Sequence, residues 1–216
     1  MKPRGAKQRS EALTLMEVLV VIVVLVLLVI LLLPALHHAK VTAQRISCVG
    51  RLEEIGLSFK SWEGDHTNLY PMSISTNLGG TLEYVARGEI FRHFQVMSNE
   101  LSTPKILVCP ADVRQPANNF GSTFSNTNIS YFIGVDADEA RPQMLLSGDR
   151  NIVGGTRLTS GILEITTNQL FSWSSEMHDG VGDIGMADGS VQQATSSRLN
   201  ELFQQTGFAT NRLAIP

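Results

Sequence analysis

The sequence predicts an α+β protein in which one long N-terminal helix packs on an antiparallel β-sheet. An apolar run from Val18 to Leu36 leads directly into an amphipathic stretch that reaches Trp62, a pattern typical of one long helix. From residue 64 onward, short apolar stretches alternate with Gly, Asn and Pro without a helical period. This alternation indicates strands joined by turns.

Charge is distributed unevenly along the 216 residues, which hold 17 Lys+Arg and 20 Asp+Glu. Positions 1–12 carry four basic residues and one acid, so the remaining body is net acidic. Nucleic-acid binding needs a clustered basic surface, and base stacking needs aromatic side chains, which form only 6% of the chain. We therefore expect no nucleic-acid partner. Two cysteines are too few for a disulfide scaffold, and their spacing fits no zinc module.

The apolar run over 18–36 would form a helix about 28 Å long, close to the roughly 30 Å of a bilayer core. The apolar stretch of a secretory signal peptide is shorter, about 7–15 residues, so this length disfavours the alternative of a signal cleaved after Ala43. Because basic residues precede the run, the positive-inside rule places residues 1–12 in the cytoplasm. The sequence therefore predicts a single-pass protein of the inner (cytoplasmic) membrane with a periplasmic or extracellular body.

Glu17 is the one charged residue at the start of the apolar stretch. A carboxylate in hydrocarbon is costly and usually has a partner; the simpler interpretation is an interfacial side chain near the lipid headgroups. The segment ALTLMEVLVVIVVLVLLVILLLPAL resembles the processing and assembly segment of type IV prepilins and type II secretion pseudopilins. This resemblance implies a pilin-like fold, with one long N-terminal helix on an antiparallel sheet, and a role as a filament subunit.

The resemblance implies that a prepilin peptidase cleaves between Ala12 and Leu13 and that Leu13 becomes the methylated N-terminus. Glu17 is then the fifth mature residue and Pro34 the twenty-second, positions at which the family has a glutamate and often a helix-kinking proline. Ala12 replaces the glycine of the family, and Leu13 replaces its usual phenylalanine. The partners implied are the peptidase and other pilin or pseudopilin subunits.

These positions have a physical role in the implied assembly. Cleavage frees an amine at Leu13, and in a filament the Glu17 carboxylate of one subunit can pair with the Leu13 amine of its neighbour. Such a pair would fix the axial register of the subunits. Pro34 has no backbone N–H and clashes with the preceding turn, so it should bend or locally melt the helix.

The second half of the predicted helix, residues 37–63, is amphipathic. One apolar stripe has the 4-3-4-3 spacing of a helix face packed on a globular domain: Cys48, Leu52, Ile55, Phe59 and Trp62. The polar run that begins at Glu63 should end the helix. The chain thus divides into a leader (1–12), a transmembrane and assembly segment (13–36), this amphipathic segment, and a β-rich globular domain (64–216).

Five apolar stretches in the body predict strands: Ile106–Cys109, Ile129–Val135, Gln143–Ser147, Leu163–Thr166 and Gln169–Ser174. Asp188–Gly189 predicts a two-residue hairpin turn between Ile184–Ala187 and Ser190–Gln193. The stretch Leu199–Phe203 predicts a short amphipathic helix with Gly207 as its C-terminal cap.

We predict a disulfide between Cys48 and Cys109. The body is expected outside the cytoplasm, where disulfides persist. Cys48 is on the apolar helix face, and Cys109 ends the apolar run 106–108. The alternative is a pair of buried free thiols, which behave as small hydrophobic residues.

The resemblance extends into the body of the chain. The segments CVGRLEEIGLSFKSW, LVCPAD and SYFIGVDADEARPQMLLSGDRN resemble pseudopilin-type proteins of planctomycetes and verrucomicrobia. His178 together with Asp188 and Gly189 matches the H-x9-D-G signature of that group. We interpret these three residues as a structural motif.

Patterns for catalysis or metal binding are weak. Gly180, Gly182 and Gly185 match G-x-G-x-x-G, but a strand and turn follow where a dinucleotide site needs a helix. The acidic groups within 136–139 and 179–188 offer oxygens that calcium prefers, yet neither has the EF-hand spacing, and solvated turns are the favoured interpretation. We predict no enzyme activity, no cofactor and no metal site.

Three classes of function remain open. They are a filament subunit, a membrane-anchored periplasmic binding module that uses the prepilin segment only as an anchor, and a secreted enzyme behind an uncleaved signal anchor. The register of Glu17 with Pro34 favours the filament subunit, because a mere anchor has no use for a buried carboxylate. The lack of a catalytic constellation disfavours the enzyme.

Overall fold

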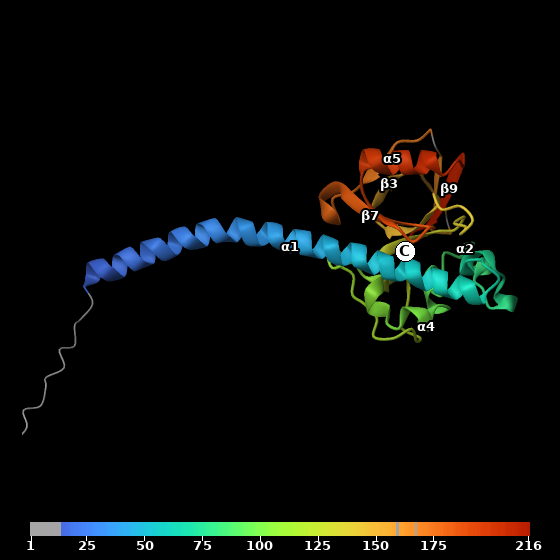
Figure 1. The fold of residues 1–216 in the computed structure, drawn as a ribbon, viewed down its shortest axis with the longest axis horizontal. Coiled ribbons are helices and arrows are strands. Elements are labelled where there is room, and N and C mark those ends of the chain that lie inside the picture. The colour runs from blue at the N-terminus through green and yellow to red at the C-terminus, as the bar shows by residue number, and fades with distance from the viewer. Residues whose placement is uncertain (1–13, 159, 167) are drawn as a thin grey trace, which may run out of the picture. The chain divides into compact units, whose positions relative to one another are not determined.

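The computed structural model describes residues 14–158, 160–166 and 168–216. The chain divides into two compact units, Met1–Thr42 and Ala43–Pro216. Helix α1 runs without interruption from Leu15 to Asp65. The fold prediction is confirmed: an α+β protein with one long N-terminal helix packed on an antiparallel sheet (Figure 1).

The first unit contains the apolar part of α1. Within the described residues, α1 is the helix that is long and apolar enough to cross a membrane, and its apolar stretch lies near the N-terminus. Such a stretch is compatible with a single-pass membrane anchor. Pro34 lies inside the helix without interrupting it, so of the two expected effects, a bend or local melting, the melting is wrong. A proline removes one backbone donor, and the hydrogen bonds of the flanking turns carry the helix past it.

The second unit is built on a seven-stranded sheet with the order β4-β5-β9-β1-β2-β7-β8 and a separate pair, β3-β6. Every strand pair is antiparallel. The strands are β1 (Tyr131–Gly134), β2 (Leu145–Asp149), β3 (Ile152–Gly154), β4 (Thr156–Arg157), β5 (Ile162–Thr166), β6 (Phe171–Trp173), β7 (Val181–Met186), β8 (Val191–Thr195) and β9 (Thr210–Ala214).

Short helices connect α1 to the sheet and flank it. The α-helices are α2 (Leu82–Val85), α3 (Phe91–Gln95), α4 (Ser98–Leu101) and α5 (Ser196–Gln205). The 3-10 helices are η1 (Pro71–Ser73), η2 (Thr76–Leu78), η3 (Pro104–Leu107), η4 (Asn126–Asn128) and η5 (His178–Gly180).

The two faces of the sheet bury two separate apolar clusters because successive strand residues point to opposite faces. Ile133 and Leu146 join the cluster that contains the α1 stripe, Cys48, Leu52, Ile55, Phe59 and Trp62. Phe132 and Leu145 join the cluster on the other face, which contains Leu199, Leu202 and Phe203 of α5. Figure 1 shows α5 across the sheet from the part of α1 that belongs to this unit. The predicted packing face of α1 is therefore confirmed.

Four of the five predicted strands are present, with shifted ends, as β1, β2, β5 and β6. The stretch Ile106–Cys109 is not a strand: residues 104–107 form η3. Pro104 stands at the start of this helix, and the side chain of Thr103 accepts a hydrogen bond from the Lys105 N–H. A capping residue followed by a proline starts a helical turn, and this local signal outweighs the β-branched residues.

The predicted hairpin is present between β7 and β8, but its turn is longer than two residues. The Gly189 N–H donates to the Met186 carbonyl at 3.0 Å, and Met186 N–H donates to the Ser190 carbonyl at 2.8 Å. Gly189 has φ +88°, a left-handed conformation that glycine adopts without strain. Helix α5 is also confirmed, and Gly207 follows its end at φ +76°.

His93 on α3 is a buried titratable group of this unit. Its Nδ1 shares a hydrogen bond of 2.6 Å with Thr81 Oγ1, and the residue is fully buried. Burial lowers the pKa of His93 from 6.5 to about 4, because an apolar environment disfavours the charged imidazolium.

We expect this histidine to make the protein less stable in acid. Between pH 6.5 and about 4 the unfolded chain binds a proton at His93 that the folded chain excludes. His93 therefore does not lower the free energy of unfolding above pH 6.5, but lowers it progressively as the pH falls below that value. The loss by pH 4 is about 3 kcal/mol. The free energy of unfolding in urea is measured for wild type and His93→Gln between pH 7.5 and 4. The difference between the two proteins at each pH isolates the contribution of His93, because the other titrating groups are common to both. Parallel pH profiles would contradict the prediction.

Candidate functional site

The expected disulfide is present. Cys48 on α1 is bonded to Cys109 just after η3, with Cα atoms 5.4 Å apart, inside the range that a disulfide requires. Both residues are fully buried. The segment after η3 is held to α1 at two further points: Gln44 Nε2 donates to the Pro110 carbonyl at 2.8 Å, and the Arg51 guanidinium donates to the Val108 carbonyl.

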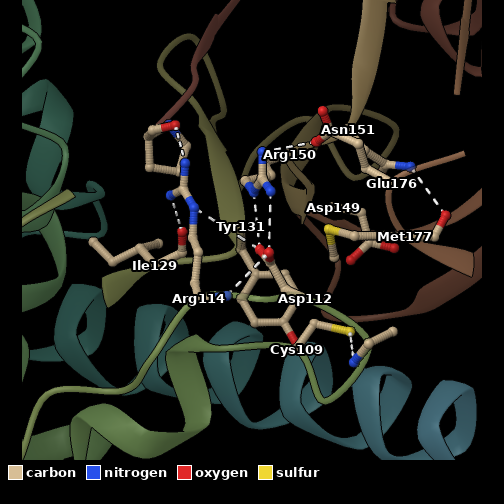
Figure 2. Close-up of polar contacts among 12 residues, drawn as sticks. Cys109, Asp112, Arg114, Ile129, Tyr131, Asp149, Arg150, Asn151, Glu176 and Met177 are labelled. Carbon is tan, nitrogen blue, oxygen red and sulfur yellow. Dashed lines mark hydrogen bonds and ion pairs between the residues drawn. The ribbon is translucent and has the colours of Figure 1, made fainter. Parts of the chain in front are cut away.

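The disulfide is part of a buried polar cluster. The members of this cluster are Cys48, Cys109, Asp149, His178 and Asp183. Cys109 Sγ lies 3.2 Å from His178 Nε2 and accepts a hydrogen bond from the Ala111 N–H at 3.4 Å. The Tyr131 hydroxyl donates to Cys48 Sγ at 3.5 Å. Figure 2 shows Cys109 close to the Tyr131 ring. Both sulfur atoms therefore have polar neighbours and are not embedded in hydrocarbon alone.

His178 reaches the cluster from a strained turn. His178 and Asp179 both have φ +52°, and Gly180 follows with φ +81°. The left-handed conformation costs a residue other than glycine roughly 1–2 kcal/mol. The turn leaves the His178 side chain 1% exposed, with Nε2 3.6 Å from Asp149 Oδ2. Strain of this kind is typical of positions where function constrains the backbone.

Two carboxylates come from adjacent strands. Asp149 ends β2 and Asp183 lies on β7, and the Asp183 N–H donates to Asp149 Oδ2 at 2.8 Å. Both side chains are fully buried. Arg45 Nε on α1 lies 3.6 Å from Asp183 Oδ1, an ion pair without a hydrogen bond. Within the described part of the chain, Asp149 Oδ1 and both Asp183 oxygens are buried without a hydrogen-bond partner.

Burial dominates the electrostatics of this cluster. It raises the pKa of Asp149 well above the usual value, and the neighbouring charge of Asp183 raises it further. Burial raises the pKa of Asp183 to about 6, against the opposing effect of Arg45. Burial also lowers the pKa of His178, as does the charge of Arg45. At neutral pH the imidazole is therefore uncharged, the form in which histidine binds metals.

A second polar network supports the segments that carry this cluster (Figure 2). Arg150 donates to Asp112 through Nε at 2.8 Å and Nη2 at 3.0 Å, and through Nη1 to Glu176 at 3.1 Å. Burial is the largest influence on Asp112 and would by itself raise its pKa, but the hydrogen bonds that the carboxylate accepts and the charge of Arg150 together lower the pKa. Asn151 Nδ2 donates to the Met177 carbonyl at 3.2 Å, directly before His178.

The three residues of the H-x9-D-G motif make different contacts. His178 belongs to the buried cluster, whereas Asp188 Oδ1 accepts from the Ser190 N–H at 2.8 Å and its hydroxyl at 2.6 Å in the hairpin turn. Gly189 faces α1, since its Cα lies 3.7 Å from the place of a Cβ on Gly56. Asp188 and Gly189 thus have structural roles in the hairpin, and His178 has polar neighbours that the motif alone did not indicate.

The other acidic and glycine-rich segments take ordinary structural positions. Asp136 pairs with Arg212 Nε at 3.0 Å, and Asp138 accepts from the Ala140 N–H at 3.0 Å. Gly182 and Gly185 lie within β7, so a strand follows Gly180 where a dinucleotide site needs a helix. The interpretation of this stretch as a glycine-rich hairpin is confirmed.

Of the predicted processing and assembly residues, Ala12 and Leu13 lie outside the described residues. Glu17 lies in the first turn of α1, where its Oε2 accepts from Thr14 N–H and Thr14 Oγ1, both at 2.8 Å. Thr14 Oγ1 in turn accepts from the Glu17 N–H at 3.3 Å. This reciprocal pair is a capping box, and the T-x-x-E spacing in the sequence is its signal.

Comparison with family models, curated proteins and solved structures finds no match to this chain. The fold and the site therefore define its class by themselves. It is an α+β protein whose long N-terminal helix is tied to the sheet domain by a disulfide, beside a buried histidine and two buried carboxylates.

Proposed function

We propose that this chain is a pilin-like, pseudopilin-type structural subunit rather than an enzyme. The apolar part of α1 would anchor it in the inner membrane, with the body on the periplasmic side, and would polymerise with the same helix of other subunits. The observation that carries the proposal is the position of Glu17, a carboxylate in the first turn of a long helix that is apolar from Val18 to Leu33.

The contacts of Glu17 leave room for a second role beside the capping box. Both Thr14 donors use Oε2, and a carboxylate has about four lone-pair sites. After cleavage between Ala12 and Leu13, the amine of a neighbouring subunit would meet this carboxylate in a membrane environment. An unpaired carboxylate is unfavourable there, so the pair would favour one axial register of the filament.

Glutamine and alanine at position 17 separate the two roles. Glutamine at the third helical position still serves a capping box but carries no charge. We expect Glu17→Gln and Glu17→Ala both to insert in the membrane and both to reduce incorporation into filaments at least about tenfold, a difference of about 1.4 kcal/mol. The measurement is the ratio of sheared, filament-bound subunit to membrane-bound subunit in the native host.

Thr14→Ala is the matched control, because it removes the cap and keeps the carboxylate; it should incorporate like wild type. Intact mass of each variant verifies that the mature chain begins at N-methyl-Leu13. Normal incorporation of Glu17→Gln would reduce Glu17 to a helix cap and favour a membrane-anchored binding module. A native chain that begins at Met1 or Gln44 would overturn the processing step.

A further inference from the structure

We propose that, when the Cys48–Cys109 bond is reduced, the protein binds one thiophilic divalent ion such as Zn²⁺ through Cys48, Cys109, His178 and Asp149. The disulfide and the metal ion would be alternative cross-links at one position. This inference is independent of the proposed function, because it rests on the geometry of the buried cluster alone.

The four donor groups converge on one point although they are far apart in the sequence. One ligand atom from each residue lies within 4.8 Å of all the others, and all four residues are buried. Zinc bonds of about 2.0–2.3 Å in a tetrahedron require donor atoms about 3.3–3.8 Å apart. Cys109 Sγ lies 3.2 Å and Asp149 Oδ2 lies 3.6 Å from His178 Nε2. The two sulfur atoms must separate, which reduction of their bond permits, and any donor pair near the 4.8 Å limit must close by about 1 Å.

The donor types suit a structural zinc site. Two thiolates, one imidazole and one carboxylate are all ligands that Zn²⁺ accepts in four-coordinate sites, and thiolates select against hard ions such as calcium. The donors come from α1, the segment after η3, the end of β2 and η5. Four protein ligands complete a tetrahedral site, so no further ligand is needed, as in structural zinc sites generally.

The local charge is the same in both proposed states. Two thiolates and one Zn²⁺ are neutral together, as a disulfide is. The net charge of the cross-link beside Asp149, Asp183 and Arg45 is therefore the same in both states. The ion would also give the buried Asp149 carboxylate a cationic partner: its Oδ2 accepts one hydrogen bond, from the Asp183 N–H, and its Oδ1 has no hydrogen-bond partner among the described residues. A buried carboxylate is stable only when it is paired or hydrogen-bonded.

Outer contacts that orient the ligands are already in place. The Tyr131 hydroxyl donates to Cys48 Sγ, and the Ala111 N–H donates to Cys109 Sγ. The Asp183 N–H fixes the Asp149 carboxylate, and the strained turn at His178 fixes the imidazole. Metal sites depend on such second contacts for ligand orientation.

The exchange balances with an external dithiol as the reductant. The dithiol gives two electrons and two protons to the Cys48–Cys109 bond and becomes a disulfide itself, which leaves two protein thiols. Binding of Zn²⁺ then releases these two protons, together with any proton held by the Asp149 carboxyl group, because thiolates and a carboxylate are the ligands. In either state α1 stays connected to the segment 107–114, so the cross-link would survive a change of redox conditions.

The test uses the full chain in detergent micelles, reduced without oxygen and freed of metal by a chelator. We expect the reduced protein to bind about one Zn²⁺ per chain, with a higher thermal midpoint than the reduced apo form. Co²⁺ should give the visible bands of a tetrahedral site and a near-ultraviolet thiolate charge-transfer band. The oxidised protein should bind neither ion at this site.

Variants assign the ligands. Cys109→Ser, His178→Ala and Asp149→Ala should each weaken Zn²⁺ binding by more than about 100-fold, beyond the loss expected for an outer contact. Asp183→Asn is the matched control, because it changes a neighbouring buried carboxylate that is not in the donor set, and should keep the Co²⁺ spectrum. His178→Ala and Asp149→Ala can still form the disulfide, so a normal melting transition of their oxidised forms verifies folding. Absence of Co²⁺ bands in reduced wild type, or unchanged bands in the His178 and Asp149 variants, would overturn the proposal.

Discussion

We expect the double variant Cys48→Ala/Cys109→Ala to have a free energy of unfolding about 4 kcal/mol below that of oxidised wild type. The bond joins residues 61 positions apart, and the chain-entropy model assigns a loop of that length about 4 kcal/mol. The bond restricts the unfolded chain, whereas the folded structure keeps its other contacts between α1 and the segment after η3. Urea unfolding of the detergent-solubilised chain, followed by the fluorescence of Trp62 and Trp173, measures the difference.

Reduced wild type in the presence of a chelator is the control for this prediction. It keeps both sulfur atoms and loses only the bond, so it should unfold near the double variant. A double variant within about 1 kcal/mol of oxidised wild type would show that the bond contributes little. If reduction lowers stability and Zn²⁺ then restores part of it, the metal ion replaces the cross-link, as RT ln(1 + [L]/Kd) describes for a ligand that binds only the folded state.

Replacement of Asp112 should have the second largest effect on stability, a loss of about 3 kcal/mol for Asp112→Ala. The Asp112 side chain is 1% exposed and accepts two hydrogen bonds from Arg150. Arg114 Nε lies 3.9 Å from the same carboxylate. Removal of the acid leaves two largely buried guanidinium groups without their shared counter-ion. Because each arginine keeps some exposure, we take the lower end of the range for a broken buried pair.

Glu176→Ala provides a matched control at the same arginine. Glu176 binds Arg150 Nη1 at 3.1 Å, but its side chain is 61% exposed, and an exposed ion pair contributes less than about 1 kcal/mol. Asp112→Asn keeps the size of the side chain and one acceptor oxygen, so it should fall between the two. Equal losses for Asp112→Ala and Glu176→Ala, measured by urea unfolding, would show that burial of the carboxylate does not matter.

Local periodicity and turn chemistry decided several elements. The apolar stripe from Cys48 to Trp62 predicted which face of α1 is buried, because a helix repeats its faces every 3.6 residues whatever it packs on. Four strands and the hairpin at Asp188–Gly189 followed from alternating and apolar runs between turn residues. The predicted strand at Ile106–Cys109 is wrong because Thr103 and Pro104 start a helical turn there. The pattern of apolar residues alone does not contain this local signal.

The order of the strands could not be obtained in the same way. Strand β9, at the C-terminal end of the chain, lies between β5 and β1, and pairs with both through backbone groups that every residue has. Side-chain patterns say which face of a strand is buried, but not which strand is its neighbour. The short strands β3 and β4 hold only two or three residues each, too few to show a period.

For the candidate site, the sequence by itself predicted the cysteine pair, because the apolar stripe of α1 buries Cys48 and Cys109 is the other cysteine of the chain; buried free thiols were the alternative. The sequence also identified His178 as a motif residue, but it did not indicate which residues contact its side chain. Only the tertiary structure decided that Asp149, His178 and Asp183 meet the disulfide. These residues come from β2, η5 and β7 and share no sequence spacing. The pairing of β2 with β7 and the left-handed turn at His178 bring them together, and both depend on packing between distant segments rather than on local preference.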